Sequence, residues 1–432
     1  MSNNYIGRKV VIVEGCRIPF LRSGTDYMDL MAYQLGAMAI KGLLRKSSLK
    51  ASLVERVIMG TVIHQTATSN VAREAALTAG IPASAPANTV TLACISASLA
   101  ITTGADLIRT GQADIVIAGG TDSASDTPIQ FRKKMRKKLF EAQKLKGLGD
   151  TLKFISKLEF ADFAPERPGI TEFTTGLTMG MDCDLMAARF GITRKEQDEF
   201  AARSHQLAAK AAEAGYLGNE IEPAEIAPNF KAIVKDNGYR GDSTAEKLSK
   251  LKPAFDKKNG TLTAANSSFL TDGAAVTLLM SEEKAKELGY KPKAMIKSYV
   301  FVGRNPKDEL LMGPAYAVPM ALKQAGVDLK DIDVLEFHEA FAAQIMTHIK
   351  CLSSDKFATE NLGLSKKVGE INMDKFNLWG GSLSLGHPFG ATGARIVTTA
   401  MNRMIKENGN LALLAACAAG GHGHAMVLER MS

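Results

Sequence analysis

Cys94 is the residue whose type and position most directly suggest covalent chemistry. It stands in Thr91-Leu-Ala-Cys-Ile-Ser-Ala-Ser98, between a predicted strand at residues 89–93 and a predicted helix that runs to about Thr110. The first turn of a helix favours a thiolate over a thiol, and open α/β sheets bind ligands at the carboxyl ends of their strands. Cys94 is therefore a candidate nucleophile, although a small buried cysteine packed under the helix fits the position equally well.

Two histidines occupy comparable positions. His387 lies in Gly386-His-Pro-Phe-Gly-Ala-Thr-Gly393, where glycines let the backbone approach a ligand and Pro388 holds the turn. A histidine presented in this way could take the proton of the Cys94 thiol as a general base. His338 follows a predicted strand at residues 334–337. A purely structural role is an equally good explanation for either histidine taken alone.

A second cysteine begins the glycine-rich segment Cys417-Ala-Ala-Gly-Gly-His-Gly-His424, directly after an apolar run. A thiol there could move a proton to or from carbon, and the exposed backbone N–H groups could bind an oxyanion. A tight glycine turn, or a phosphate-binding loop in which the cysteine is incidental, explains the segment as well. The occurrence of all four features at strand ends favours one shared site.

The elements that must position these residues follow an α/β pattern. In the first part, strands are predicted at residues 10–13, 57–62 and 113–118, the last closed by Gly119-Gly120, with a helix at residues 30–44. The last third repeats the order: a strand at residues 334–337, a segment at 376–379 leading into a glycine-rich turn, a helix from about 391 to 406 and a strand at 411–416. We therefore predict two similar α/β halves.

The middle of the chain is richer in charge and in helix signals than in strands. Thr193-Arg-Lys-Glu196 has the form of a capping box that opens a helix. We predict an inserted domain at residues 127–255. The N-terminal half then comprises residues 1–126 completed by 256–292, with residues 274–280 returning to its sheet, and the C-terminal half comprises residues 293–432.

The net charge of +8 is local. Ten basic residues stand against two acidic ones between Arg132 and Lys157, which accounts for the whole excess. Apolar residues such as Phe140 and Leu148 alternate with these charges, so the segment could lie on an anionic membrane or dock a partner subunit, or it could be a solvated helix. No nucleic-acid-binding motif accompanies the charge, and no nucleic-acid partner is expected.

The remaining composition indicates a globular chain of several domains. Its 432 residues include five widely separated cysteines without CxxC spacing, which argues against a disulfide framework and against a structural zinc site. Residues 1–15 do not form a signal-peptide pattern, and no apolar run approaches the roughly 20 residues of a membrane span. We therefore expect a reducing, cytoplasmic location, with at most peripheral contact to the inner membrane.

These motifs resemble the signatures of the thiolase superfamily over nearly the whole chain. The branch they resemble most is the long-chain 3-ketoacyl-CoA thiolase that forms the beta subunit of fatty-acid oxidation complexes. The points of likeness are Leu92-Ala-Cys-Ile-Ser96, His338-Glu-Ala-Phe341, Ala415-Ala-Cys-Ala-Ala-Gly420, residues 263–273, residues 377–393 and the basic residues 131–137. The resemblance implies two βαβαβαββ halves in a five-layer α-β-α-β-α core, with an inserted, mainly helical loop domain.

The resemblance also implies roles. Cys94 would carry the acyl group, His387 would take its proton, and Cys417 would exchange the proton at carbon. His338 would complete an oxyanion site with His387 through a bound water, and the backbone N–H groups of Cys94 and Ala419 would form a second oxyanion hole. Met179, Arg240 and Ser268 match positions that contact coenzyme A. Coenzyme A and acyl-CoA would be substrates, with no metal and no other cofactor.

The family implies a homodimer or tetramer, and the branch implies a complex with a hydratase–dehydrogenase alpha subunit and membrane contact through residues 131–160. Three alternatives to β-oxidation remain open from the sequence. They are a biosynthetic acetoacetyl-CoA thiolase, a decarboxylating condensing enzyme on the same fold, and an inactive acyl-CoA-binding scaffold. Condensing enzymes use a cysteine with two histidines, so Cys417 at the second proton-transfer position favours a non-decarboxylating thiolase.

Overall fold

The computed structural model describes residues 7–166, 169 and 171–431. Residues 1–6, on which part of the signal-peptide expectation rests, lie outside this description. The N-terminal half supplies strands β1 (Val10–Arg17), β2 (Leu21–Arg22), β3 (Arg56–Gly60), β4 (Ala87–Val90), β5 (Ile115–Asp122) and β10 (Thr271–Ser281). The C-terminal half supplies β11 (Ala294–Gly303), β12 (Val334–Phe337), β13 (Leu411–Ala418) and β14 (His422–Arg430).

These strands form one mixed sheet in the order β12-β13-β14-β11-β1-β10-β5-β3-β4, with β2 paired to β10. The two halves meet at the antiparallel pair β1 and β11, where Val11 faces Met295 and Ile12 faces Ala294. This junction is short compared with the pairing of β1 and β10, which extends from Val10 to Arg17. The sheet is therefore two half-sheets joined along a narrow seam.

The helices build the layers around the two half-sheets. They are α1 (Ala32–Ser47), α2 (Val71–Thr78), α3 (Ser96–Arg109), α9 (Glu282–Glu287), α10 (Pro306–Glu309), α11 (Gly313–Ala325), α12 (Ala342–Leu352), α13 (Asp355–Phe357), α14 (Ser382–Leu385) and α15 (Thr392–Lys406). The first half-sheet packs against α1 and α2, the second against α11 and α12, and α3 and α15 lie between the two.

Side-chain alternation along the strands produces this layering. On β1, Val11 and Val13 pack toward α1, whereas Val10 and Ile12 pack into the middle layer with residues of α3 and α15. On β13, Leu413 faces α11 and α12, whereas Leu414 faces inward. The predicted α/β fold with two similar halves and a five-layer core is confirmed. In the described residues of the second half, however, the segment at 376–379 forms no full strand and contributes only one β-bridge, between Leu335 and Phe376.

The strand β5 differs in detail from its prediction, because Gly119 and Gly120 lie within it instead of closing it. Their lack of a side chain is needed where other backbone passes close by. A Cβ at Gly120 would lie 1.9 Å from the carbonyl oxygen of Gly390, in the loop that follows His387. Gly120 thus lets the His387 loop sit directly on β5, whereas Gly119 makes room for the neighbouring strand β10.

The segment between β5 and β10 carries the other helices: α4 (Lys133–Ala142), α5 (Leu148–Ile155), α6 (Met179–Phe190), α7 (Arg194–Glu213) and α8 (Ala245–Ser249). It also carries the short strands β6 (Gln130–Phe131), β7 (Pro165–Glu166), β8 (Ala224–Ile226) and β9 (Lys231–Ile233). The predicted capping box is confirmed, since Thr193 and Glu196 bond each other's backbone N–H at the start of α7.

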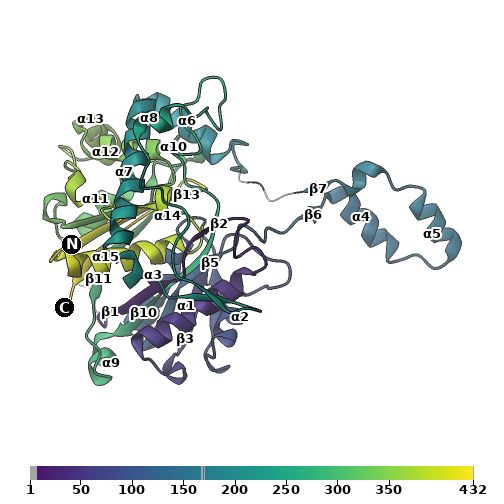
Figure 1. Ribbon diagram of the computed structural model, residues 1–432, viewed down its shortest axis with the longest axis horizontal. Helices are drawn as coiled ribbons and strands as arrows, with labels where there is room; N and C mark the ends of the chain where they lie inside the picture. The colour runs from purple at the N-terminus through teal and green to yellow at the C-terminus, as the bar shows by residue number, and fades with distance from the viewer. Residues whose placement is uncertain (1–6, 167–168, 170, 432) are drawn as a thin grey trace.

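Helices α4 and α5 form an arm that projects from the rest of the molecule, as Figure 1 shows. Strands β6 and β7 pair antiparallel at its base. Within the described chain, no helix combines the length and the apolar character that crossing a membrane requires.

Candidate active site

Cys94 lies in a tight turn between β4 and α3. Ala93 before it has a φ of +47°, a left-handed conformation that a non-glycine residue adopts only when its surroundings enforce it. Ser96 provides part of this restraint, because its hydroxyl accepts from the N–H of Leu92 and donates to the carbonyl of Ala93, both at 2.7 Å. The turn therefore presents the Cys94 thiol in a fixed direction.

The Cys94 thiol is held in its neutral form. Burial raises its pKa from the ordinary 9.0 to about 11, although the backbone N–H groups of Ala419 and Cys94 donate to the sulfur and oppose the rise; the Asp122 charge adds to it. The expectation that the helix terminus favours the thiolate was therefore wrong for the resting site, because desolvation outweighs it. A thiol in this state needs a base to become a nucleophile.

His387 has the geometry of such a base. Its Nδ1 lies 2.6 Å from Oγ1 of Thr392, whose hydroxyl donates to the carbonyl of Pro388 at 3.1 Å. Since that hydroxyl proton is committed, Thr392 accepts from Nδ1–H, and the lone pair of a neutral His387 is on Nε2. Burial, with a smaller contribution from Arg395, lowers the pKa of His387 to about 3, so the ring is neutral at physiological pH.

His338 lies beside His387, with ring centroids 4.1 Å apart at an angle of 45°. Its pKa is held well below the ordinary 6.5 by burial and then by His387 and Arg395. Sγ of Cys94 and a nitrogen of each ring lie within 4.8 Å of one another. In the described part of the chain, Nε2 of either ring has no hydrogen-bond partner. Buried polar atoms of this kind point to a substrate that would occupy the space.

Cys417 completes the group near the end of β13. Burial raises the pKa of its thiol above the ordinary value, and the neighbouring Cys94 raises it further. The structure thus brings together the four residues that the sequence singled out. It adds Cys183 on α6, a buried thiol whose pKa is raised by burial and by Cys417. No sequence pattern had pointed to Cys183.

The glycine loop after Cys417 places two backbone donors near the thiol. The N–H of Ala419, one of the two donors predicted for the second oxyanion hole, is directed at the sulfur of Cys94. The next N–H, of Gly420, donates instead to Oε2 of Glu172 at 2.8 Å. Glu172 belongs to the inserted segment, which the loop therefore contacts directly. The Gly420 donor was not distinguished by the sequence.

The three residues predicted to contact coenzyme A border this site to different degrees. The N–H of Ser268 donates to the carbonyl of Ala340, two residues after His338, at 2.9 Å. Met179 packs against the apolar cluster that includes Cys417 and Phe341. Among the described residues, Arg240 makes no hydrogen bond or ion pair with the four candidate residues; its backbone N–H donates to Nδ1 of His205.

A second arginine near Arg240 was not anticipated. Arg22 stacks over the ring of Phe269 at 3.8 Å, and its pKa is lowered by burial and by the charge of Arg240. Two guanidinium groups thus lie close enough to repel each other near Phe269, the residue after Ser268. Such a pair of cations suits an anionic ligand.

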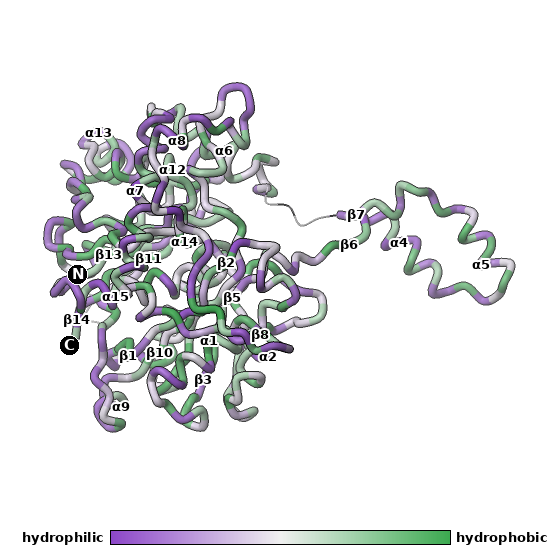
Figure 2. Tube along the Cα trace, in the orientation of Figure 1, coloured by the Kyte–Doolittle hydropathy of each residue, from purple (hydrophilic) through white to green (hydrophobic). Residues whose placement is uncertain are grey.

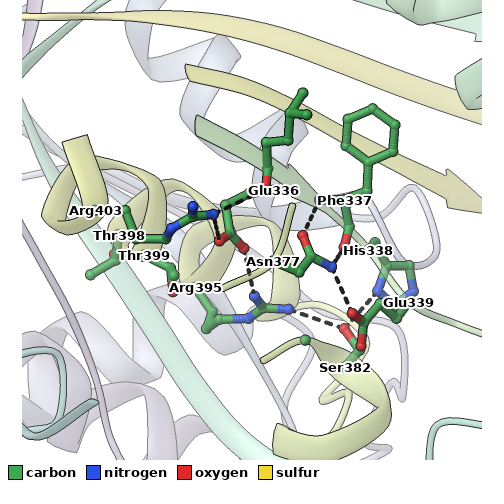
Figure 3. Close-up of polar contacts among 12 residues, drawn as sticks. Glu336, Phe337, His338, Glu339, Asn377, Ser382, Arg395, Thr398, Thr399 and Arg403 are labelled. Atoms are coloured by element: carbon green, nitrogen blue, oxygen red, sulfur yellow. Dashed lines mark hydrogen bonds and ion pairs between the residues drawn. The ribbon is translucent and has the colours of Figure 1, made fainter. Parts of the chain in front are cut away.

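A group of buried charges lies near His338 (Figure 3). Glu336 Oε1 accepts from Arg403 Nη1 at 2.7 Å, and Oε2 lies 3.7 Å from Nη1 of Arg395. Burial raises the pKa of Glu336 to about 7, and the two arginines oppose this rise. Asn377 donates to Glu339 at 2.7 Å and bonds the backbone of Phe337 on both sides, which fixes the segment around His338. None of these supporting residues could be recognised from local sequence.

Two family models match almost the whole chain. The thiolase N-terminal domain matches residues 10–283, and the thiolase C-terminal domain matches residues 290–430. This protein belongs to the thiolase family. The division between the two thiolase models falls between β10 and β11, the strands that precede and follow α9.

Named relatives and solved thiolases extend over the full chain. The human mitochondrial trifunctional enzyme subunit beta is 53% identical over 98% of this chain and 88% of its own length. The 3-ketoacyl-CoA thiolase of Yersinia pestis (strain Pestoides F) is 44% identical over 98% of this chain and 97% of its own length. The Bacillus anthracis acetyl-CoA acetyltransferase superposes with a TM-score of 0.84 at 33% identity, covering 99% of this chain and 100% of that one. Human mitochondrial 3-ketoacyl-CoA thiolase superposes with a TM-score of 0.83 at 30% identity, covering 98% of this chain and 99% of that one.

The two halves of this thiolase contribute different parts of the site. Cys94 comes from the N-terminal half, whereas His338, His387 and Cys417 come from the C-terminal half. They meet because β4, β12 and β13 end on the same side of the middle layer that α3 and α15 form. The site therefore exists only when both halves are assembled.

Proposed function

We propose that this thiolase is a 3-ketoacyl-CoA thiolase of fatty-acid β-oxidation, an acetyl-CoA C-acyltransferase that works through an acyl-Cys94 intermediate. The observation that carries the proposal is the convergence of Cys94, His338, His387 and Cys417 in one buried site. Relatives named trifunctional enzyme subunit beta and 3-ketoacyl-CoA thiolase, at 44–53% identity, support the degradative assignment.

In the first half-reaction, Nε2 of His387 takes the thiol proton as Sγ of Cys94 attacks the 3-keto carbon of the substrate. The electron pair of the C2–C3 bond then leaves with the acetyl-CoA portion, and the resulting enolate oxygen is held by His387 and His338. Cys417 donates its proton to C2, which releases acetyl-CoA and leaves the shortened acyl group on Cys94. A preorganised donor at such an oxyanion is typically worth about 3 kcal/mol.

In the second half-reaction, the sulfur of free coenzyme A attacks the acyl-Cys94 thioester after losing its proton to a site base. The tetrahedral oxyanion is proposed to lie between the N–H groups of Cys94 and Ala419, which in the resting site are directed at Sγ. Collapse of this intermediate releases the acyl-CoA and restores the Cys94 thiolate, which is reprotonated. Because one product leaves before the second substrate reacts, the kinetics are ping-pong.

Coenzyme A is proposed to bind along Met179 and Ser268, with its phosphates toward Arg240. The cationic pair of Arg22 and Arg240 supports this direction. No metal or other cofactor is needed for the steps above, although the spacing of Cys94, His338 and His387 could also hold a metal ion. A rate that survives dialysis against a chelator supports the metal-free proposal, and a rate that returns only with added metal contradicts it.

The test of function is cleavage of a 3-ketoacyl-CoA series, from acetoacetyl to 3-ketohexadecanoyl, with free coenzyme A and chromatographic detection of the products. We expect cleavage whose rate rises with chain length. Preference for acetoacetyl-CoA would indicate a biosynthetic thiolase, and reaction of malonyl but not acetyl thioesters would indicate a condensing enzyme. If the protein binds acyl-CoA but shows neither turnover nor an acyl-Cys94 adduct, it is an inactive acyl-CoA-binding scaffold.

The arm is proposed to serve peripheral association with an anionic membrane or with a hydratase–dehydrogenase subunit. Its outer residues are apolar and exposed: Phe140 is 68% exposed, Leu148 83% and Leu152 61%. Lysines and Arg136 lie among them, and Figure 2 shows hydrophilic and hydrophobic stretches alternating around the arm. The name of the human relative, a trifunctional enzyme subunit, supports a partner.

Vesicle flotation with neutral and anionic lipid, and co-purification with such a partner, test the arm. We expect anionic vesicles or the partner to retain the enzyme, and Leu148→Glu with Leu152→Glu to weaken the association without changing thiolysis in solution. Equal binding to both vesicle types together with no complex would remove the proposal.

A homodimer or tetramer in the cytoplasm is proposed as the working form, and mass measurement in solution tests the oligomer.

A further inference from the structure

Ser382 lies between the catalytic centre and the buried charges behind it. It begins α14, five residues before His387, and its side chain is fully buried. The described residues give its hydroxyl two partners: Nδ1 of His338 at 2.8 Å and Nη2 of Arg395 at 3.1 Å. Figure 3 shows the three side chains in this order, with Glu336 beyond Arg395. Each contact constrains where the protons are.

A guanidinium group can only donate hydrogen bonds, so Ser382 Oγ accepts from Arg395. The one proton of the hydroxyl then has Nδ1 of His338 as its acceptor. In the opposite arrangement, with Nδ1 protonated, the oxygen would accept twice and its own proton would have no acceptor among the described residues, a costly state in a buried site. The neutral ring of His338 therefore carries its proton on Nε2.

The neighbouring histidine is in the other tautomer. Thr392 gives its hydroxyl proton to Pro388 and accepts from Nδ1–H of His387, which leaves a lone pair on Nε2. Two adjacent rings thus present different chemistry to the same space, a lone pair from His387 and an N–H from His338. Both Nε2 atoms are free of partners in the part of the chain that the structure describes.

Among the described residues, the guanidinium of Arg395 donates one hydrogen bond, to Ser382, and forms an ion pair with Glu336. It is fully buried on α15, and its Nη1 lies 3.7 Å from Oε2 of Glu336, while Glu336 is fixed on its other side by Arg403. The guanidinium must remain a donor, since it cannot be deprotonated in proteins. Nη2 of Arg395 therefore donates to the Ser382 oxygen, and the hydroxyl proton of Ser382 points toward Nδ1 of His338.

We propose that Ser382, oriented by Arg395, is a positioning residue that fixes His338 as the Nε2–H tautomer, so that His338 donates to the enolate while His387 acts as base. This inference rests on the oxyanion role of His338 proposed above. It predicts that the Ser382 hydroxyl acts on carbon–carbon cleavage, which makes the enolate, and much less on acyl transfer, whose oxyanion is held by backbone N–H groups.

The experiment compares Ser382→Ala, Ser382→Thr and the control Ser384→Ala in the full-length enzyme. Ser384 is a buried serine of the same short helix whose hydroxyl bonds Ser204 and Gly381 and not His338. Two rates are measured: thiolysis of a 3-ketoacyl-CoA, and exchange of labelled coenzyme A with a saturated acyl-CoA, which passes through acyl-Cys94 without forming an enolate. Thermal unfolding of each variant reports its folding.

For Ser382→Ala we expect kcat of thiolysis to fall about tenfold to a hundredfold, less than for loss of a whole oxyanion donor, with KM and acyl exchange within about twofold. Ser382→Thr retains the hydroxyl and should recover most of the loss, and Ser384→Ala should show no such split. Nitrogen NMR of histidine-labelled enzyme, assigned with His338→Ala, should show an unprotonated Nδ1 in the wild type and a changed tautomer in Ser382→Ala.

Equal loss of both rates, no loss of either, or a protonated Nδ1 in the wild-type enzyme would overturn the inference. If Ser382→Ala does not fold, the tautomer measured in the wild-type enzyme and the rates of Ser382→Thr still decide it. Failure of the underlying role is distinguishable: if His338→Ala itself cleaves 3-ketoacyl-CoA at the wild-type rate, the oxyanion role of His338 is wrong. If His338→Ala is impaired while Ser382→Ala is normal, only the role of Ser382 is wrong.

Discussion

At the scale of single residues, the site holds two thiols to which we assign different work. Both sulfurs accept backbone hydrogen bonds, that of Cys94 from the N–H of Ala419 and from its own N–H, and that of Cys417 from its own N–H. Cys417 lies deeper, with only 1% of its surface exposed. Both pKa values are raised by burial, so neither thiol ionises without a partner. The proposed nucleophile and the proposed acid–base group at carbon are therefore distinguished by position, since both are neutral thiols at rest.

Replacing these thiols should divide the reaction. Cys94→Ala should abolish both thiolysis and coenzyme A exchange with a saturated acyl-CoA, because the acyl carrier is missing. Cys417→Ala should lower thiolysis by about a thousandfold or more while exchange continues, because exchange moves no proton at carbon. Intact-protein mass measurement should detect acyl-enzyme only when Cys94 is present. Cys16→Ala, in the outer core far from the site, is the control, and full thiolysis by either active-site variant would contradict the assignment.

The pH dependence of alkylation tests the protonation state of Cys94. Because its pKa is raised to about 11, the thiol form dominates below that pH, and at pH 8 roughly one molecule in a thousand carries a thiolate. Inactivation by iodoacetamide should therefore quicken about tenfold per pH unit from pH 7 to pH 10. A rate that levels off below pH 8 would instead reveal a thiolate–imidazolium pair with His387.

The sequence alone predicted the four side chains that the structure brings together, because each stands at the end of an apolar strand in a distinctive local motif. It could not identify Thr392, Ser382 or Arg395 as their partners, since these contacts depend on how α14 and α15 are placed in three dimensions. It also gave the wrong direction for the pKa of Cys94. Helix position can be read from the sequence, whereas the desolvation that outweighs it depends on the complete packing.

At the scale of elements, the site depends on close backbone contact between β5 and the His387 loop. Gly390 donates its N–H to the buried Asp122 at 2.5 Å, and Asp122 also accepts from the turn after β3 through Val62 and Ile63. One carboxylate at the end of β5 therefore ties together loops from both halves. The sequence predicted the strand but not that its glycines lie inside it, because their role concerns a neighbour distant in sequence.

Gly120→Ala tests this contact. The added methyl group would collide with the backbone of Gly390, which cannot move without shifting His387. We expect thiolysis to fall by about a hundredfold or more and the melting temperature to drop. Gly218→Ala is the matched control, because a Cβ there meets nothing within 4 Å and the backbone is not in the left-handed region. Wild-type thiolysis by Gly120→Ala would show that the loop has more freedom than this packing allows.

At the scale of the whole molecule, the predicted duplication explains where the site is. The sequence indicated two similar halves from the repeated order of strands and helices, and the structure has them. It gave no indication that β1 and β11 would join the two half-sheets, because two residue pairs leave no recognisable pattern. Nor did it show that the charged segment becomes a projecting arm, since amphipathic helices are equally common on compact surfaces.

The shared middle layer determines how this chain folds. Because the apolar cluster around α3 and α15 draws residues from both halves, neither half alone buries its middle-layer surface, and calorimetry should show one cooperative transition instead of two. The helices can form earlier within each half, because their hydrogen bonds are local, whereas the pairing of β10 with β1 and β5 joins residues far apart in the sequence. During refolding, recovery of thiolysis should therefore lag behind recovery of circular dichroism, and simultaneous recovery would show that docking is not a late step. Enzymatic activity in this molecule is thus a reporter of the last folding event, the docking of one half onto the other.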